Sequence, residues 1–294
     1  MTHDIIKTAV FPVAGLGTRF LPVTKAGPKE MLPIVDKPII QYAVEEAIAA
    51  GIKQFVFVTS NGKRAIEDYF DSNYELESRL EERGKYEALA TVKNILPPDV
   101  SIVYVRQSAP LGLGHAVLCA KDVVGDQPFA VLLPDDIMHA EKEICMRSMV
   151  ELFVKTKSSI LAVQEIPNDK TDQYGIVSIK QENNFEEITS IVEKPAPKDA
   201  PTNLAVTGRY ILTPQIFSLL EKTQRGVGGE IQLTDAIAEL LKQESVYSYK
   251  FVGDRFDCGS RMGFLKATIA YALERDDLRD RLKEYLAEVT AKIL

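Results

Sequence analysis

The fold is decided by residues 8–22, which read TAVFPVAGLGTRFLP. The stretch from Thr8 to Ala14 is a short apolar run, and such a run predicts a buried strand. Gly15 and Gly17 then form a turn in which backbone N–H groups can approach a phosphate or a base closely. Because structural turns use the same chemistry, the two glycines alone leave a ligand site and a plain turn equally open.

The residues after the glycine turn argue against two classes of nucleotide-binding protein. Three cations, Arg19, Lys25 and Lys29, lie close to the turn, and prolines recur at positions 22, 28, 33 and 38. A dinucleotide-binding unit begins a helix inside its glycine motif, but prolines at this spacing prevent a regular helix. There is also no GxxxxGK[ST] motif. We therefore expect an extended loop folded over the site, and neither a dehydrogenase nor a P-loop protein.

Outward from this stretch, short apolar runs alternate with segments of helical periodicity. Further strands are expected at 54–59, 101–106, 129–133 and 160–164, and helices at 41–50, 63–93, 114–123 and 144–155. Within 63–93, Asn73 and Gly84 interrupt the helical pattern. Such alternation predicts a mixed, mostly parallel sheet with helices on both faces, in an α/β doubly wound arrangement.

The pattern changes after Pro167. Short strands are expected at 176–179, 188–193 and 204–212, followed by helices at 214–221 and 230–243 and a strand at 246–252. The three strands without long helices between them indicate a small mixed-strand insertion. Residues 262–294 are charged and amphipathic, so we predict an α/β domain over 1–260 and a helical C-terminal tail over 261–294. The tail is compatible with solvation and with packing in an oligomer.

Composition excludes several classes of protein. The 294 residues are 46% hydrophobic and 26% charged, with a net charge of −7, which argues against a nucleic-acid partner because phosphate backbones need a basic face. The three cysteines form no CxxC pair, so zinc and a disulfide framework are not expected. No apolar run approaches the about 20 residues needed to span a bilayer, and no signal peptide is visible. We expect a cytoplasmic protein without membrane contact.

Carboxylates follow two of the expected strands. Asp135 and Asp136 end the strand at 129–133, where ligands bind in doubly wound sheets, and Mg²⁺ is commonly held there by one or two carboxylates plus substrate phosphates. A turn with side chain to backbone hydrogen bonds is the alternative, and it competes more strongly for Asp136 than for Asp135. Asp257 also follows a strand, although alone it reads as a residue near a helix N-cap.

These motifs together resemble a known family. GLGTRFLP at 15–22 and PKEMLP at 28–33 resemble the GxGTRxxPxT and PKxxxP motifs of the nucleotide-sugar pyrophosphorylases. The resemblance implies a Rossmann-like nucleotidyltransferase fold in which Ala14, Gly15 and Gly17 bind the nucleotide. It also implies that Arg19 and Lys29 hold the triphosphate. The role of Lys25 stays open.

The resemblance extends to the metal, the base and the sugar. It implies that Asp135 and Asp257 hold one Mg²⁺ ion, while the role of Asp136 stays open. Base recognition is expected from Gln107 and Gly112, since a buried amide paired with a base edge discriminates strongly. The sugar-side residues implied are Gly175 and Val206 for the hexose, Glu193 for its hydroxyls and Lys194 for its phosphate. Without the resemblance, Glu193 and Lys194 read as a surface ion pair.

The implied reaction is direct nucleotidyl transfer. The 111–116 segment and the helical insertion at 63–93 resemble the bacterial branch of the family that acts on UTP and glucose 1-phosphate, and that forms homodimers or homotetramers. No covalent nucleophile is needed, because positioning and charge neutralisation lower the barrier of such transfers. The alternatives are transfer of thymidylyl to the same sugar phosphate and a non-catalytic nucleotide-sugar sensor.

Overall fold

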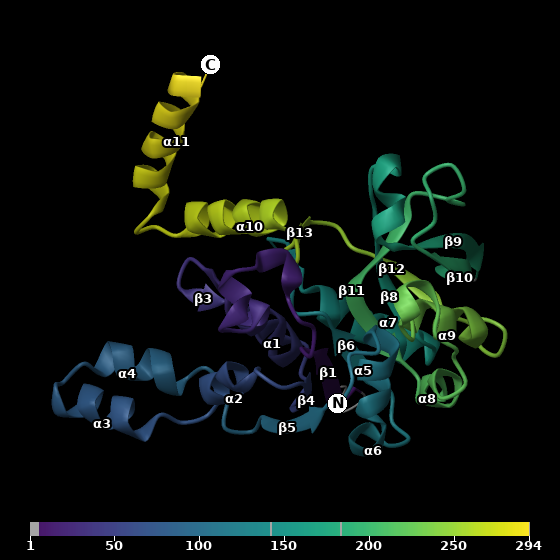
Figure 1. Ribbon diagram of the computed structural model, residues 1–294, viewed down its shortest axis with the longest axis horizontal. Helices are drawn as coiled ribbons and strands as arrows, with labels where there is room; N and C mark the ends of the chain where they lie inside the picture. The colour runs from purple at the N-terminus through teal and green to yellow at the C-terminus, as the bar shows by residue number, and fades with distance from the viewer. Residues whose placement is uncertain (1–5, 142, 183, 294) are drawn as a thin grey trace.

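The computed structural model describes residues 6–141, 143–182 and 184–293. A nine-stranded sheet lies at the centre, with the strand order β5-β4-β1-β6-β11-β8-β12-β10-β9 (Figure 1). Its strands are β1 Thr8–Pro12, β4 Gln54–Thr59, β5 Ser101–Arg106, β6 Phe129–Leu132, β8 Ile160–Glu165, β9 Gly175–Glu182, β10 Phe185–Glu193, β11 Leu204–Leu212 and β12 Tyr247–Lys250.

The sheet is mixed, as the sequence predicts. The block β5-β4-β1-β6 is parallel throughout, and β8 pairs parallel with β12. Strand β11 lies antiparallel between β6 and β8, and β10 lies antiparallel between β12 and β9. Strands β10 and β11 therefore run opposite to the other strands of the sheet. In the parallel block, the carboxyl ends of β5, β4, β1 and β6 lie at the same edge.

Helices cover both faces of the sheet because the strand side chains alternate. Phe55 and Phe57 of β4 face one apolar core, and Val56 and Val58 face the other. The first face is covered by α1 (Ile39–Ala49) and α7 (Cys145–Thr156). The second is covered by α5 (Leu113–Cys119), α6 (Lys121–Val124), α8 (Gln215–Leu220) and α9 (Leu233–Leu240).

The predicted helical stretch at 63–93 forms three helices. They are α2 (Arg64–Phe70), α3 (Tyr74–Glu82) and α4 (Tyr86–Lys93), so the breaks fall at the predicted Asn73 and Gly84. The Asn73 side chain accepts a hydrogen bond from the Leu76 amide at 3.1 Å and thereby caps α3. Helices α3 and α4 extend away from the sheet at the lower left of Figure 1.

Several short elements were not predicted. The loop after the glycine turn contains the 3₁₀ turns η1 (Thr18–Phe20), η2 (Val23–Lys25) and η3 (Lys29–Met31), followed by the strands β2 (Pro33–Ile34) and β3 (Lys37–Pro38). The turns η4 (Asn168–Gln173) and η5 (Val227–Gly229) lie further along. The segment after β6 forms the strand β7 (Asp136–His139), which pairs antiparallel with β13 (Asp254–Asp257). This second small sheet matters most for the site.

The C-terminal residues form two helices, α10 (Arg261–Glu274) and α11 (Arg279–Ile293). Ser260, the N-cap of α10, accepts a hydrogen bond from the Gly263 amide, so a helix begins at the predicted boundary, although the division into domains stays a prediction. Helix α11 has no buried residue and points away from the sheet (Figure 1). The described helices are all too short or too polar to span a bilayer.

A buried ion pair links α1 to the centre of the sheet. Arg209 of β11 is 1% exposed and donates to Glu46 Oε2 from Nη2 at 2.7 Å and from Nε at 2.9 Å. Its Nη1 also donates to the Leu133 carbonyl at 2.9 Å. A buried charge is tolerated only when it is paired in this way.

We expect Glu46→Ala to lower the free energy of unfolding by about 3–5 kcal/mol, because Arg209 is left with an uncompensated buried charge. Urea denaturation measures this loss. The control is Glu239→Ala, which removes the partner of Lys242 in a pair whose side chains are 68% and 55% exposed. Such exposed pairs contribute about 0–1 kcal/mol, so equal losses in the two variants would contradict the prediction.

Candidate active site

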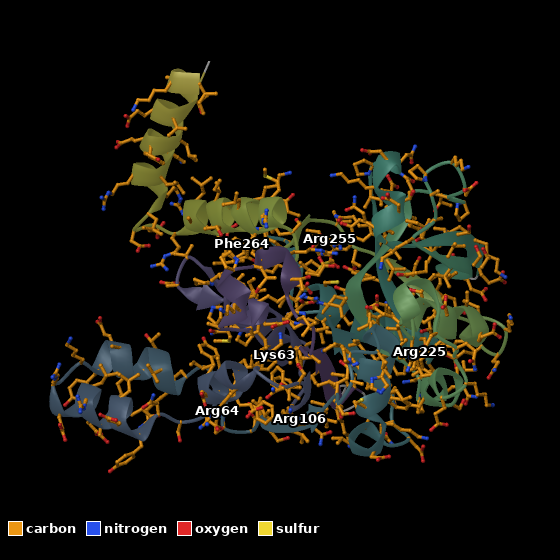
Figure 2. All side chains as sticks on the ribbon, viewed as in Figure 1. Lys63, Arg64, Arg106, Arg225, Arg255 and Phe264 are labelled. Atoms are coloured by element: carbon orange, nitrogen blue, oxygen red, sulfur yellow. The ribbon has the colours of Figure 1, made fainter. Side chains whose placement is uncertain are left out.

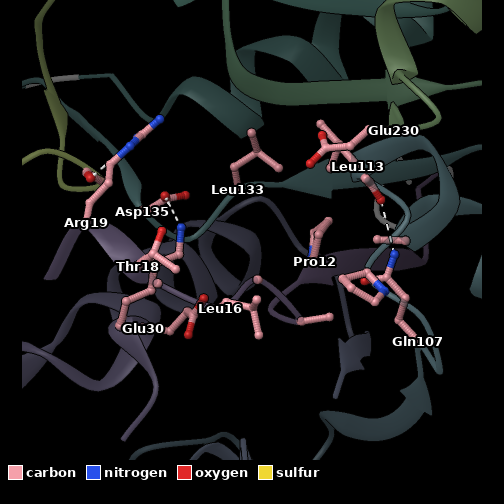
Figure 3. A pocket seen from close by; sticks show the side chains of 18 of the residues that line it. Pro12, Leu16, Thr18, Arg19, Glu30, Gln107, Leu113, Leu133, Asp135 and Glu230 are labelled. Carbon is pink, nitrogen blue, oxygen red and sulfur yellow. Dashed lines mark hydrogen bonds and ion pairs between the residues drawn. The ribbon is translucent and has the colours of Figure 1, made fainter. Parts of the chain in front are cut away.

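A cavity of about 650 Å³ opens where β1 and β6 end (Figure 3). Figure 3 shows Arg19 and Asp135 toward one end of it and Gln107 with Glu230 toward the other. The sequence-predicted residues that line it are Ala14, Gly15, Gly17, Arg19, Lys29, Gln107, Gly112 and Asp135. The nucleotide half of the predicted site is thus gathered around one cavity.

The glycine turn packs directly on the loop that carries Lys29. Gly17 has φ 66°, and a Cβ atom there would lie 3.2 Å from Lys29 Cβ. Thr24 donates to the Gly17 carbonyl at 2.8 Å, and Ser60 donates to the Ala14 carbonyl at 2.9 Å. These contacts fix the glycine turn against the Lys29 loop on one side and against the segment after β4 on the other.

The three cations near the turn have different surroundings. Lys29 Nζ lies 2.5 Å from Asp135 Oδ2, inside the cavity. Arg19 is exposed, and its Nη1 lies 3.5 Å from the Gly259 carbonyl oxygen. Lys25 is exposed and is not among the residues that line the cavity. Arg19 and Lys29 are therefore placed to meet an anion in the cavity.

A second, buried ion pair supports the Lys29 loop. Glu30 follows Lys29 and is 1% exposed, and its Oε2 accepts from Lys63 Nζ at 2.8 Å. Lys63 is itself 6% exposed. The pair ties the loop to the turn after β4 and so limits the positions that the Lys29 backbone can take.

The structure brings Asp135 and Asp257 together. A Cβ atom placed on Gly259 would lie 2.8 Å from Asp135 Oδ2 and 2.9 Å from Asp257 Oδ1, so both oxygens face one point. The Cys258 amide donates to the Asp135 carbonyl at 2.7 Å, and the Gly259 amide donates to Asp257 Oδ1 at 3.0 Å. Strand pairing between β7 and β13 holds this arrangement.

The surroundings shift the pKa values of the two carboxyl groups in opposite directions. Burial disfavours the ionised form of Asp135, but the ammonium of Lys29 outweighs this and lowers the pKa. Burial raises the pKa of Asp257, and the nearby carboxylates of Asp136 and Asp135 raise it further. A cation between Asp135 and Asp257 would relieve the repulsion between them.

The pair fits a divalent metal ion such as Mg²⁺. Both side chains offer hard carboxylate oxygens, which this ion prefers. Within the described part of the chain, no three or more His, Cys, Asp or Glu side chains gather into a metal-binding group.

Asp136 has a different role from its neighbour. Arg255 Nε lies 2.6 Å from Asp136 Oδ1 and 2.9 Å from Oδ2, and the Gly208 amide donates to Oδ2 at 2.8 Å. Asp136 is 5% exposed and begins β7. Its carboxylate is therefore engaged within the protein, through an ion pair and a hydrogen bond to distant segments and not through the local hydrogen bonds of a turn.

At the far end of the cavity, Gln107 is held by its amide nitrogen. Its Nε2 lies 3.1 Å from the Gly112 carbonyl oxygen and 2.9 Å from His115 Nδ1. Gly112 has φ 98°, and a Cβ atom there would lie 2.6 Å from Glu230 Cβ, so only glycine fits. His115 lies in the first turn of α5, and its contact with Gln107 helps to orient the amide.

The predicted sugar-side residues form a neighbouring group outside the lining of this cavity. Gly175 of β9 pairs with Glu193 of β10. Glu193 Oε1 lies 3.1 Å from Lys194 Nζ, and its Oε2 accepts from Thr234 at 2.7 Å. Val206 lies on β11, next to the residue that pairs with β9.

Sequence reasoning missed several residues of this region. Glu30, Leu133 and Glu230 line the cavity, Thr234 contacts Glu193, and Arg255 holds Asp136. Glu30 could have been noticed as an acid inside a cation-rich stretch. Glu230 and Arg255 carry no local signal, because contacts between distant segments bring them to the site.

Comparisons with known proteins point to one family. A family model described as nucleotidyl transferase matches residues 9–274. A Bacillus subtilis protein named UTP–glucose-1-phosphate uridylyltransferase is 50% identical over 282 residues, which cover 96% of each chain. A UTP-bound structure named UGPase from Acinetobacter baumannii is 47% identical with a TM-score of 0.89, covering 96% of this chain and 99% of that one. A UDP-glucose pyrophosphorylase complexed with UDP-glucose is 45% identical with a TM-score of 0.84, covering 92% and 100%.

We expect divalent metal binding to weaken on acidification, beginning above the ordinary aspartate pKa of about 3.9. Only an ionised carboxylate binds the ion, and the raised pKa of Asp257 means that protons compete for it at higher pH. Electron paramagnetic resonance titration with Mn²⁺ at a series of pH values measures this. Asp257→Asn should bind weakly at every pH. An affinity that stays constant down to the ordinary aspartate range would contradict the prediction.

Proposed function

This chain belongs to the nucleotidyl transferase family, and on that premise we propose that it transfers uridylyl from UTP to glucose 1-phosphate, giving UDP-glucose and pyrophosphate. The observation that carries the proposal is the convergence of Asp135 and Asp257 beside Lys29, at one end of a cavity shaped by the glycine turn. The relatives that bind UTP or UDP-glucose support the choice of substrates.

Gln107 recognises the base in this proposal. With its amide nitrogen directed at Gly112 and His115, the amide oxygen is left to accept the N3–H of uracil. Buried groups of this kind discriminate because a base without the matching donor leaves the oxygen unsatisfied. Ala14, Gly15 and Gly17 supply the backbone on which the nucleotide lies, and Gly112 lets the base approach closely.

Charged residues align the two phosphates. Arg19 and Lys29 hold the triphosphate, with Arg19 nearer to the departing pyrophosphate, and Lys194 holds the phosphate of the sugar. Gly175, Glu193 and Val206 contact the hexose, with Glu193 directed at its hydroxyls. A phosphate monoester is already an anionic nucleophile at neutral pH, so in-line attack on the α-phosphorus needs no general base. Positioning and charge neutralisation by these side chains lower the barrier.

The cofactor in this proposal is Mg²⁺, held by Asp135 and Asp257. When bound, the ion neutralises phosphate charge and orients the two substrates. The side chain of Lys29 must leave Asp135 to reach the triphosphate, and Asp136 stays bound to Arg255.

Two alternatives share this site. A thymidylyltransferase would use the same metal and phosphate residues, since thymine also presents an N3–H to Gln107. A non-catalytic sensor would be expected to lack an aspartate or the lysine of the sugar phosphate, whereas Asp135, Asp257 and Lys194 are all present. Assembly as a homodimer or homotetramer and a cytoplasmic location remain predictions.

The decisive assay measures pyrophosphate release from glucose 1-phosphate with UTP or dTTP. We expect release with UTP to exceed that with dTTP, to stop on chelation and to return with Mg²⁺. Asp135→Asn should lose about 10²–10³-fold in turnover, the loss typical for a group that stabilises transition-state charge. Equal turnover with dTTP would favour the thymidylyl alternative. No release with either nucleotide would favour the sensor.

Lys194→Ala should lower turnover by a similar factor, equivalent to about 2.7–4 kcal/mol of barrier, while UTP affinity is retained. The reason is that Lys194 lies with the sugar-side residues and outside the cavity lining. Steady-state kinetics and a calorimetric titration with UTP measure the two effects. Lys198→Ala, at an exposed position nearby, is the matched control. Parallel loss of UTP affinity in Lys194→Ala would contradict its assignment to the sugar phosphate.

A further inference from the structure

Arg255 contacts both halves of the site without lining the cavity. It lies where the C-terminal segment meets the central sheet (Figure 2). On one side its guanidinium pairs with Asp136, and the two side chains are only 10% and 7% exposed. On the other side its guanidinium carbon lies 4.7 Å from the centroid of the Tyr174 ring. Asp136 belongs to the metal side of the site and Tyr174 to the sugar side.

The contact with Asp136 acts on both predicted metal ligands. Asp136 follows Asp135 directly, and in the β7–β13 ladder it is the register partner of Asp257. Arg255 lies two residues before Asp257 on the same strand. The ion pair therefore crosses the small sheet diagonally and holds together the two strands that bring Asp135 and Asp257 to one point.

The contact with Tyr174 acts on the lysine of the sugar phosphate. The Tyr174 carbonyl accepts the Lys194 amide at 3.0 Å, and Gly175 follows Tyr174 on the chain. Lys194 has φ 44°, a conformation that is uncommon for a residue with a side chain and that depends on its surroundings. Displacement of Tyr174 would therefore move the backbone that aims Lys194.

We infer that Arg255 is a positioning residue that sets Asp135 and Asp257 on one side, and Lys194 on the other, at the separation that the reaction needs. Arginine suits this task because its planar group donates to a carboxylate from its edge, here from Nε, while its face lies over an aromatic ring. The inference rests on the proposed function, since that function makes the distance between these groups matter.

A purely structural role is the competing explanation, because buried ion pairs often contribute only to stability. Arg209 offers a matched control. Its side chain is 1% exposed, against 10% for Arg255, and it is paired with Glu46 of α1. It also donates to the Leu133 carbonyl after β6, but among the described residues none of its hydrogen bonds runs to β13 or Tyr174. Loss of Arg209 should destabilise the protein without loosening the link between the two halves.

The test compares Arg255→Met, Arg255→Lys and Arg209→Met with the unaltered full chain. Mn²⁺ affinity is measured by electron paramagnetic resonance in the presence of α,β-methylene UTP, whose α–β bridge cannot be cleaved. Glucose 1-phosphate affinity is measured by calorimetry in the same mixture, and thermal unfolding is followed for each variant. Neither binding experiment needs turnover, so the inference is tested whether or not pyrophosphate is released.

Arg255→Met should weaken Mn²⁺ binding by about 10–100-fold, the usual effect of losing a residue that orients metal ligands. It should also weaken glucose 1-phosphate binding, while metal-free binding of the UTP analogue stays unchanged. Arg255→Lys should recover part of the Mn²⁺ affinity, because it keeps the charge, but less of the sugar-phosphate affinity, because it loses the flat stacking group. Arg209→Met should lower the unfolding temperature and leave both affinities near the original values.

Two results would overturn the inference. One is unchanged Mn²⁺ and glucose 1-phosphate affinity in folded Arg255→Met. The other is an equal loss of both affinities in Arg209→Met and Arg255→Met when the two variants unfold at similar temperatures. That result would assign the effect to general stability. A variant Tyr174→Leu adds an independent check if Arg255→Met fails to fold. Tyr174→Leu should weaken glucose 1-phosphate binding and leave Mn²⁺ binding intact. Weaker Mn²⁺ binding with unchanged glucose 1-phosphate binding would also overturn the inference.

Discussion

Holding two carboxylates close together in a partly buried place is the constraint on which the rest of this structure depends. Asp135 and Asp257 repel each other, and burial adds to the cost of their charges. The β7–β13 ladder supplies the rigidity, Lys29 supplies a compensating charge, and Arg255 neutralises the third acid, Asp136, that accompanies them. Removal of Lys29 or Arg255 would leave a carboxylate without its partner.

The mixed sheet explains how distant segments reach one edge. The parallel block places the ends of β1 and β6 side by side, so the glycine turn and Asp135 emerge together. Strand β11, buried along its whole length, runs between β6 and β8 and carries Gly208 and Arg209 to the Leu133–Asp136 turn. Near its start, at Ala205, β11 also pairs with β9, and β9 pairs with β10. These two strands hold Gly175 and Glu193.

Most of the fold could be predicted from sequence because its elements carry local patterns. Strands β4, β5 and β11 begin and end at the predicted residues, and Asn73 and Gly84 mark real helix ends. The short strands β7 and β13 were missed, since neither contains enough residues for a period to be recognised. The residues between Ala14 and Lys29 that line the cavity were picked out because they lie in one short stretch of motifs. Glu230, Thr234 and Arg255 were not, because tertiary contacts alone bring them to the site.

The ion pair between Lys29 and Asp135 has a thermodynamic consequence for the order of events. In the proposed function, a divalent ion that arrives alone competes with the Lys29 ammonium group, which already lies 2.5 Å from Asp135 Oδ2. A triphosphate offers that ammonium new acceptors and so releases Asp135. A triphosphate that binds Lys29 therefore raises the affinity of Asp135 for the metal. By linkage, the metal raises the affinity for the triphosphate by the same factor. The proposed function therefore predicts cooperativity between the ion and the nucleotide through the exchange of a single lysine.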